Sequence, residues 1–317
     1  MTNPPTNAPL AGEFALIDWI RSRTPTGPNT LLGIGDDCAI IRTTPGDDWL
    51  VTTDMLMDGR HFVLDRDGPE AAGRKALAVN LSDIAAMAGT PVAATVSVAL
   101  PKTQAREIAQ GIHEGLSPLA RRFNVDLVGG DTNGWDGPLV ISVTLFGTCP
   151  PQGAVTRAGA RPGDQIFVTG PLGGSLLGRH LHPEPRVLEA KALIESVSIR
   201  AMIDVSDGLV SDLGHILEES GGLGAALDLS HIPIHEDARL MSQADQRSPL
   251  DHALNDGEDF ELCFVVGPEE AMRLKAGLHP LVLHHVGEVQ SEAGIRIRLA
   301  DGTVRPIVSQ GFDHLRP

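Results

Sequence analysis

Tyrosine and cysteine are the residues that this sequence lacks most clearly. It has no tyrosine, and its three cysteines, Cys38, Cys149 and Cys263, lie far apart without a CxxC pair. Such spacing excludes a disulfide framework and a zinc knuckle. We therefore expect free thiols in a reducing compartment, which favours a cytoplasmic protein.

Positive charge is also scarce. Lys and Arg total 25 against 41 Asp and Glu, which gives a formal net charge of −16. Nucleic acids and anionic membranes bind to basic surfaces, so we expect neither as a partner. A phosphate ligand would meet the same repulsion unless some carboxylates hold metal ions. The alternative is that the acidic residues are ordinary solvated surface.

Long apolar runs are absent. The longest strongly apolar run, around Val92–Leu100, is about half of the roughly 20 residues that a membrane helix needs. Met1 to Leu10 is polar and rich in proline, with no basic start and no apolar stretch, so it is not a signal peptide. We expect a soluble protein.

The common nucleotide-binding and hydrolase signatures are missing as well. There is no GxxxxGK[ST], no GxSxG and no HExxH. Gly33-x-Gly35-x-x-Cys38 approaches a dinucleotide fingerprint, but its third glycine is absent and two aspartates stand where pyrophosphate would lie. These absences exclude a P-loop enzyme and disfavour a Rossmann site.

The sequence has enough hydrophobic residues to form a core, and it predicts both helices and strands. Its 317 residues and 42% hydrophobic content suit two domains of ordinary size. A Gly- and Pro-rich segment after Cys149 places the predicted boundary there, giving domains 1–150 and 151–317. Strands are predicted at 48–53, 92–100, 125–128, 139–146, 165–168, 225–229, 261–266 and 281–286. Helices are predicted at 69–88, 103–123, 186–195, 207–219 and 268–278. The fold class is therefore α/β (α+β).

Acidic clusters recur at or just past the apolar runs, often beside glycine. They are Gly33-Ile34-Gly35-Asp36-Asp37, Thr52-Thr53-Asp54, Asn80-Leu81-Ser82-Asp83, Gly129-Gly130-Asp131, Asp204-Val205-Ser206-Asp207-Gly208 and Gly257-Glu258-Asp259. Mg²⁺ prefers oxygen ligands, and glycines let backbone N–H groups approach phosphates. Each cluster alone is also a common turn, and Asp207 is also interpretable as a helix N-cap. Asp83 is harder to explain in that way, because aspartate is unfavourable inside a helix.

Other polar residues have two interpretations each. His61 is either a loop histidine or part of a site beside the Thr52–Asp54 cluster. His180 and His182 are predicted to be surface residues. Arg157 by default is a solvated linker arginine, and Phe312 by default packs down the C-terminal tail.

Taken in order, the motifs resemble the thiamine-monophosphate kinase family over nearly the full length. The resemblance includes the acidic clusters above and the following further segments: Gly12-Glu13-Phe14, Gly59-Arg60-His61-Phe62, the run from Lys75 to Met87, Thr156-Arg157, Pro162-Gly163-Asp164, Val168-Thr169-Gly170 and Gly311-Phe312-Asp313-His314. The wider superfamily contains aminoimidazole ribonucleotide synthetase, selenophosphate synthetase and a hydrogenase-maturation protein.

The resemblance implies a two-domain aminoimidazole-ribonucleotide-synthetase-like fold that dimerises through the N-terminal sheet. It also implies ATP-dependent phosphorylation of thiamine monophosphate to thiamine diphosphate with several Mg²⁺ ions. By motif position, the implied metal ligands are Asp37, Thr52, Thr53, Asp54, Asp83, Asp131, Asp204 and Asp207. The implied ATP contacts are Gly130, Asp131, Arg157 and Ser206, and the implied substrate contacts are His61, Glu258 and Phe312. The acceptor phosphate is largely deprotonated at neutral pH, so we expect neither a covalent nucleophile nor a strong general base.

Three positions depart from the family pattern. Asp256 stands where a glycine usually precedes Gly257, Ala88-Gly89 inverts a usual pair, and Ala158 replaces a usual serine. We expect Asp256 to add charge beside the substrate segment. The alternatives are a selenophosphate-synthetase-like enzyme, disfavoured because residues 1–30 contain no cysteine, and a nucleotide-binding maturation or scaffold protein.

Overall fold

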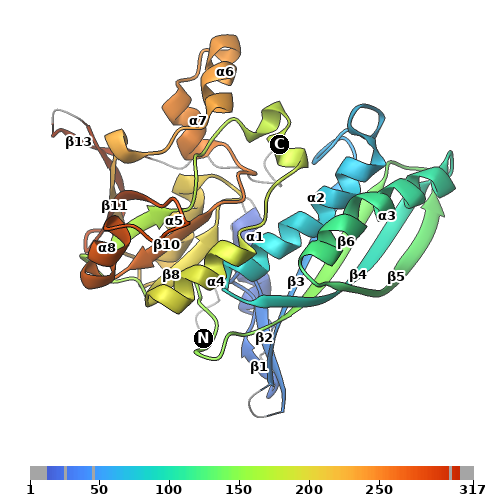
Figure 1. Cartoon of the computed structure of the whole chain (residues 1–317), viewed down its shortest axis with the longest axis horizontal. Coiled ribbons are helices and arrows are strands. Elements are labelled where there is room, and N and C mark those ends of the chain that lie inside the picture. The colour runs from blue at the N-terminus through green and yellow to red at the C-terminus, as the bar shows by residue number, and fades with distance from the viewer. Residues whose placement is uncertain (1–12, 25–26, 45–46, 300–301, 308–317) are drawn as a thin grey trace, which may run out of the picture.

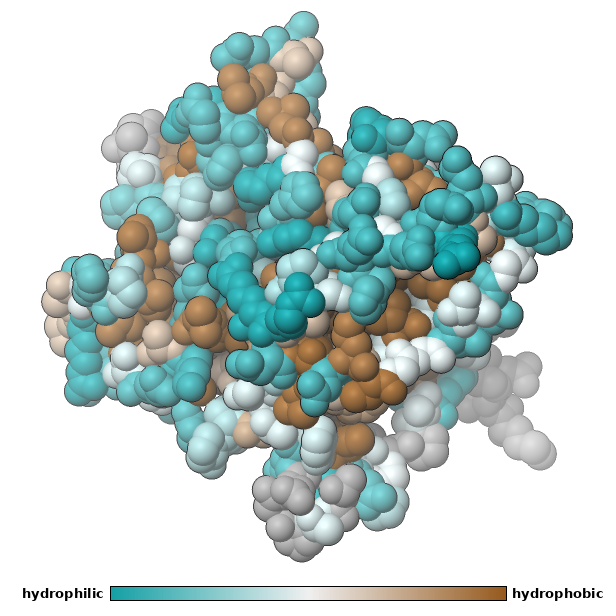
Figure 2. All heavy atoms as spheres, turned by 45° about the vertical axis from the view of Figure 1, so that its right-hand side comes forward, coloured by the Kyte–Doolittle hydropathy of each residue, from teal (hydrophilic) through white to brown (hydrophobic). Residues whose placement is uncertain are grey.

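The structure is a computed structural model and describes residues 13–24, 27–44, 47–299 and 302–307. The described residues form two sheets with helices packed around them (Figure 1). None of the described helices combines the length and the apolar character that crossing a bilayer requires. Hydrophilic side chains cover most of the face drawn in Figure 2, with smaller apolar patches between them.

The first sheet has six strands in the order β1-β2-β3-β6-β4-β5. All neighbours are antiparallel except β4 and β5, which are parallel. A parallel pair needs a crossover, and α3 supplies it. The elements of this half are α1 (Glu13–Arg21), β1 (Thr30–Leu32), β2 (Ala39–Thr44), β3 (Asp47–Met57), α2 (Leu64–Ala86), β4 (Thr90–Pro101), α3 (Ala105–Arg122), β5 (Asp126–Trp135) and β6 (Val140–Thr148).

Helix α2 crosses the middle of the molecule (Figure 1), and from Ala71 to Ala86 all of its residues except Arg74 and Asp83 are buried. Its first turn is separated from the rest by a break at Gly68, whose φ is 80°. Glycine tolerates this conformation, and Pro69 then starts the regular helix, because proline suits a first helical position. The predicted helix start at Pro69 therefore coincides with the break.

Helices α2 and α3 approach so closely that their backbones touch at glycines. A Cβ added to Gly73 would lie 2.2 Å from the carbonyl oxygen of Ile112, and one added to Gly115 would lie 1.9 Å from that of Glu70. Real side chains cannot occupy such positions without moving a backbone. Glycine at these two positions fixes how far α2 stands from α3.

The second sheet has seven strands in the order β13-β12-β9-β11-β7-β10-β8. Side chains of β7 alternate between two apolar cores: Ile166 and Val168 pack into one, and Phe167 into the core that the first sheet shares. The elements of this half are β7 (Gln165–Val168), the 3-10 helices η1 (Ser175–Leu177) and η2 (Arg179–Leu181), α4 (Val187–Ser196), β8 (Ile199–Asp204), α5 (Leu209–Glu219), β9 (Gly224–Asp228), η3 (Leu229–His231), α6 (Glu236–Asp245), α7 (Pro249–Asn255), β10 (Leu262–Val266), α8 (Pro268–Lys275), β11 (His284–Gln290), β12 (Gly294–Arg298) and β13 (Val304–Ile307).

The two sheets match the predicted mixed fold class. The predicted boundary at residue 150 falls in the segment between β6 and β7. Several elements differ from the sequence prediction, among them β2, which follows Asp37 and was not predicted. Strand β8, which ends at Asp204, was not predicted, and β11 begins three residues later than expected, at His284.

Candidate active site

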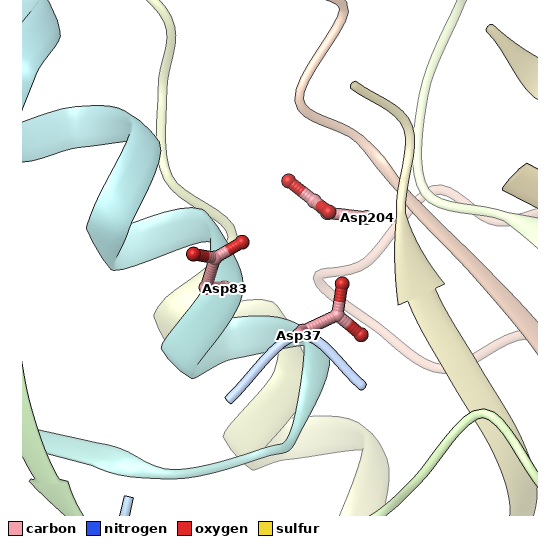
Figure 3. Close-up of side chains that lie close together, drawn as sticks. All are labelled: Asp37, Asp83 and Asp204. Carbon is pink, nitrogen blue, oxygen red and sulfur yellow. The ribbon is translucent and has the colours of Figure 1, made fainter. Parts of the chain in front are cut away.

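The carboxylates of three aspartates, two of them buried and one partly buried, converge between the two halves of the chain. Asp37 lies in the loop before β2, Asp83 on α2 and Asp204 at the end of β8, and one carboxylate oxygen of each lies within 4.8 Å of the others. Figure 3 shows the three side chains entering the same space from different elements. Residues far apart in the sequence therefore form one acidic cluster.

Neighbouring hydroxyl groups orient this cluster. Thr52 Oγ1 donates a hydrogen bond to Asp83, and Ser82 Oγ donates one to Asp204 over 2.6 Å. Asp54, two residues after Thr52 on the same face of β3, lies beside Asp83, and the two carboxylates can form a hydrogen bond only when one of them carries a proton. Five of the sequence-predicted ligands are thus brought together: Asp37, Thr52, Asp54, Asp83 and Asp204.

Burial and mutual repulsion perturb these acids. Burial, followed by the charges of Asp54 and Asp204, raises the pKa of Asp83 well above its usual range. Burial also raises the pKa of Asp204, and together with Asp37 it raises the pKa of Asp54 to about 6. Carboxylates in this state bind either protons or cations. Clustered carboxylate and hydroxyl oxygens are the ligands that Mg²⁺ takes, so this donor set fits that ion.

Arg157 partly neutralises the cluster. Its guanidinium donates to Asp37 through Nη2 over 2.9 Å and through Nε over 3.3 Å, and its backbone N–H donates to Asp36 over 3.1 Å. Burial opposes the charged form, but Asp37 and Asp36 outweigh it and raise the pKa of Arg157. The default interpretation as a solvated linker arginine is wrong, because the side chain lies at the cluster.

Three predicted ligands lie elsewhere. Thr53 projects from the opposite face of β3 and donates to the carbonyl of Val143. Asp131 and Gly130 lie on β5, an exposed strand separated from β3 by β6 and β4. At about 4.8 Å per strand, that separation is about 14 Å. Asp207 follows β8 and lines the adjoining cavity.

A cavity of about 580 Å³ adjoins the acidic cluster. This volume is in the range of small-molecule sites. Six of the predicted site residues line it: Asp54, His61, Arg157, Ser206, Asp207 and Glu258. Phe312, the other predicted substrate contact, lies outside the described residues.

The cavity also contains residues that sequence reasoning missed. Arg60, Arg66, His180 and Phe260 line it. His180 was predicted to be on the surface, but it is only 6% exposed, and its Nδ1 lies 3.0 Å from the carbonyl oxygen of Ser175. The surface prediction is wrong for His180 because the 3-10 helix η2 turns it inward; it is right for His182, which is exposed.

Glu258 is held by a lysine on α2. Lys75 Nζ lies 2.8 and 2.7 Å from the two carboxylate oxygens of Glu258 and donates to the carbonyl oxygen of His61 over 2.8 Å. The Lys75 side chain is fully buried. A lysine in the middle of an otherwise apolar helical run was the sequence signal for this pair.

Asp256 does not face the cavity as expected. Its carboxylate accepts hydrogen bonds from the backbone N–H of Gly174, from Arg247 and from His252. Asp259 accepts one from the N–H of Gly173. The two aspartates therefore pin the 256–259 segment to a glycine turn, and the charge of Asp256 is compensated away from the substrate segment.

Comparison with known proteins defines the class. Residues 35–149 match the model of the AIR synthase related protein N-terminal domain, and residues 161–300 match that of its C-terminal domain. Together these matches cover most of the chain, in agreement with its two-sheet fold. The protein thus has the two-domain architecture of the AIR synthase related proteins.

Similarity to individual proteins identifies the family within this class. A thiamine-monophosphate kinase of Rhodopirellula baltica is 42% identical over 95% of this chain and 97% of its own length. That of Escherichia coli is 36% identical, over 96% and 98%. The solved structure "AaThiL complexed with AMPPCP and TMP" matches with a TM-score of 0.82 and 30% identity, over 96% and 97%. The chain belongs to the thiamine-monophosphate kinase family.

Proposed function

We propose that this protein is a kinase that uses ATP to phosphorylate thiamine monophosphate to thiamine diphosphate. The observation that carries the proposal is the cavity, which joins the acidic cluster at Asp54 to the predicted substrate contacts His61 and Glu258. The end of the cavity at Asp54 suits phosphate groups with bound metal ions, and the end at Glu258 suits a cationic ring. The names of the relatives, one of them solved with AMPPCP and TMP, support the same assignment.

Mg²⁺ is part of the proposal. The residues that would hold it are Asp37, Thr52, Asp54, Asp83 and Asp204, whose oxygens converge. When bound, Mg²⁺ supplies positive charge that offsets the repulsion between two phosphate compounds. Asp207 lies close enough to the cavity to hold a further ion. Thr53 and Asp131 stay candidates from the family motif alone.

The protein's own groups then position the reactants. Ser82 and Thr52 fix the orientation of two cluster carboxylates, and Arg157 places a positive charge at the cavity wall. Arg157, Ser206 and Gly130 are the proposed ATP contacts. His61, Glu258 and Phe312 are the proposed contacts of thiamine monophosphate. Its thiazolium ring would gain roughly 0.5–2 kcal/mol from an aromatic face.

The phosphoryl group is proposed to pass directly between substrates. A phosphate monoester has its second pKa near 6, so the attacking oxygen is already largely deprotonated at pH 7. In-line positioning and charge neutralisation then account for catalysis without a covalent intermediate. Incubation with labelled ATP alone tests this, because a trapped phosphoprotein would refute direct transfer.

The central experiment measures ADP release with thiamine monophosphate, with thiamine and without an acceptor. Release that depends on thiamine monophosphate supports the proposal. Release without an acceptor, or none under any condition, would favour instead a selenophosphate-synthetase-like enzyme or a maturation or scaffold protein.

We also propose that the protein is a cytoplasmic homodimer. Met55 and Met57 alternate with Asp54 along β3, so they lie on the sheet face opposite α2, and they are 57% and 39% exposed. Exposed apolar groups on one sheet face favour self-association. The three cysteines are free thiols, in keeping with a reducing compartment. Sedimentation would test the dimer, and a monomer would contradict it.

A further inference from the structure

The inference concerns Lys75, which the family motifs do not assign to the site. Its side chain is completely buried, yet all three of its N–H donors have acceptors: two carboxylate oxygens of Glu258 and the carbonyl oxygen of His61. Lysine is almost never fully buried unless it is paired. Burial lowers the pKa of Lys75, and the charge of Glu258 opposes that shift.

Lys75 connects three separate segments. It lies on α2, His61 lies in the loop between β3 and α2, and Glu258 precedes β10 in the other half of the chain. His61 and Glu258 both line the cavity, whereas Lys75 is not among the residues that line it. Lys75 therefore acts on the cavity through these two residues and not by direct contact.

The backbone at Glu258 needs such an anchor. Glu258 and Phe260 have φ values of 61° and 53°, a region that side chains other than glycine rarely adopt. Their N–H groups donate to the carbonyl oxygens of Ser206 and Val205 over 2.7 and 2.8 Å. These bonds hold the backbone, and the ion pair with Lys75 fixes the direction of the Glu258 carboxylate.

Helix α2 also sets a distance. Lys75, Val79 and Asp83 are four residues apart and share one face of the helix. Val79 lines the cavity between them. At 1.5 Å per residue, the backbones of Lys75 and Asp83 are about 12 Å apart along the helix. The same helix thus holds Glu258 at one end and the acidic cluster at the other.

We propose that Lys75 is a positioning residue for the acceptor substrate, which holds Glu258 and the His61 loop at a fixed distance from the acidic cluster. The inference rests on the proposed function, because the acceptor is taken to be thiamine monophosphate. Its cationic ring lies at Glu258 and its phosphate at the cluster. Lys75 touches neither reactant.

Four variants test this: Lys75→Met, Glu258→Gln, the double variant, and Arg74→Met as the matched control. Arg74 is the neighbour on α2, bonds Pro183 and Glu184, and does not line the cavity. Lys75→Met should raise the KM for thiamine monophosphate by about 10- to 100-fold, the equivalent of losing one charged hydrogen bond. The KM for ATP should change by less than about threefold, and Arg74→Met should leave both constants near the wild-type values.

The double variant separates positioning from folding. Lys75→Met leaves the partly buried Glu258 carboxylate without its partner and is expected to lower the melting temperature, whereas the double variant removes both charges and should recover most of that loss. If positioning is the role, Lys75 acts through Glu258, so the double variant should raise the KM for thiamine monophosphate no further than Glu258→Gln alone does. A KM rise in the double variant that equals the product of the two single rises, or equal rises for both substrates in Lys75→Met, overturns the inference.

The wild-type protein is assayed first. If it releases no ADP in response to thiamine monophosphate, the proposed function fails, and the inference fails with it. If the wild type is active and the Lys75 variants keep their KM values, the inference alone fails.

Discussion

Removal of the Asp256 carboxylate should destabilise the protein measurably. The residue is 7% exposed and accepts hydrogen bonds from the Gly174 N–H over 3.0 Å, His252 Nδ1 over 2.8 Å and Arg247 Nη1 over 3.0 Å. Asp256→Ala removes all three acceptor contacts.

The loss of stability in Asp256→Ala depends on which hydrogen bonds its three partners retain. His252 still faces Asp245 and Arg247 still bonds Asp251, so these two lose only part of their interactions. The Gly174 N–H is left buried and unpaired, at a cost of about 1–3 kcal/mol. With one charged contact of about 1.5–3 kcal/mol added, the total is about 2.5–6 kcal/mol.

This free energy converts into a melting temperature. At about 2.1 cal/mol/K per residue, 317 residues unfold with an entropy of about 0.67 kcal/mol/K. A loss of about 2.5–6 kcal/mol then lowers the melting temperature by about 4–9 °C if the described halves unfold together. Scanning calorimetry of wild type and variant at one pH measures the shift.

Asp251→Ala is the control. Asp251 bonds the same arginine and also accepts a hydrogen bond from Asn255, but its side chain is 33% exposed, so these contacts should together contribute about 1–2 kcal/mol, or about 1.5–3 °C. A drop for Asp256→Ala no larger than that of the control would refute the reasoning, since it would mean that burial adds nothing to the Asp256 contacts.

Three further changes test other parts of the site. Asp54→Asn removes a cluster carboxylate and should lower turnover by about 100-fold or more in an ADP-release assay; near-normal turnover would exclude Asp54 as a ligand. Phe312→Ala should raise the KM for thiamine monophosphate while ATP binding stays nearly intact; equal loss of both would contradict the substrate contact. Burial lowers the pKa of His215 to about 4, so from about pH 6.5 down to 4 the unfolded chain binds a proton that the folded protein does not. The free energy of unfolding therefore decreases by up to about 3 kcal/mol as the pH is lowered through this range. The His215→Gln variant should lack this decrease. Asp54 has a raised pKa, so its contribution to stability increases as the pH is lowered and opposes that of His215. Urea unfolding of the wild type and of His215→Gln across this pH range isolates the histidine. Identical pH dependences of the two proteins would contradict the lowered pKa of His215.

Local pattern was enough to predict the elements that carry most of the cluster. Helix α2 and strands β3 and β4 were predicted within a few residues of their observed bounds. The predicted strands 48–53 and 125–128 end too early, because β3 and β5 continue past Asp54 and Asp131 to Met57 and Trp135.

Contacts between segments that are distant in the sequence could not be predicted from local patterns. The Lys75–Glu258 pair joins residues 183 positions apart, and the Ser82–Asp204 bond joins residues 122 apart. No periodicity encodes such pairs, since they depend on how the second sheet packs against α2. His180 was misplaced for the same reason: its burial comes from neighbours far away in the sequence.

The glycine contacts between α2 and α3 have a consequence on the opposite side of α2. Any side chain at Gly73 or Gly115 would push α2 away from α3 by an ångström or more, since a Cβ there would lie 2.2 or 1.9 Å from a carbonyl oxygen. Lys75 and Ser82 move with the helix, and each bonds a residue of the second half. The placement of Lys75 and Ser82 relative to the second half thus depends on Gly73 and Gly115, which lie where α2 packs against α3.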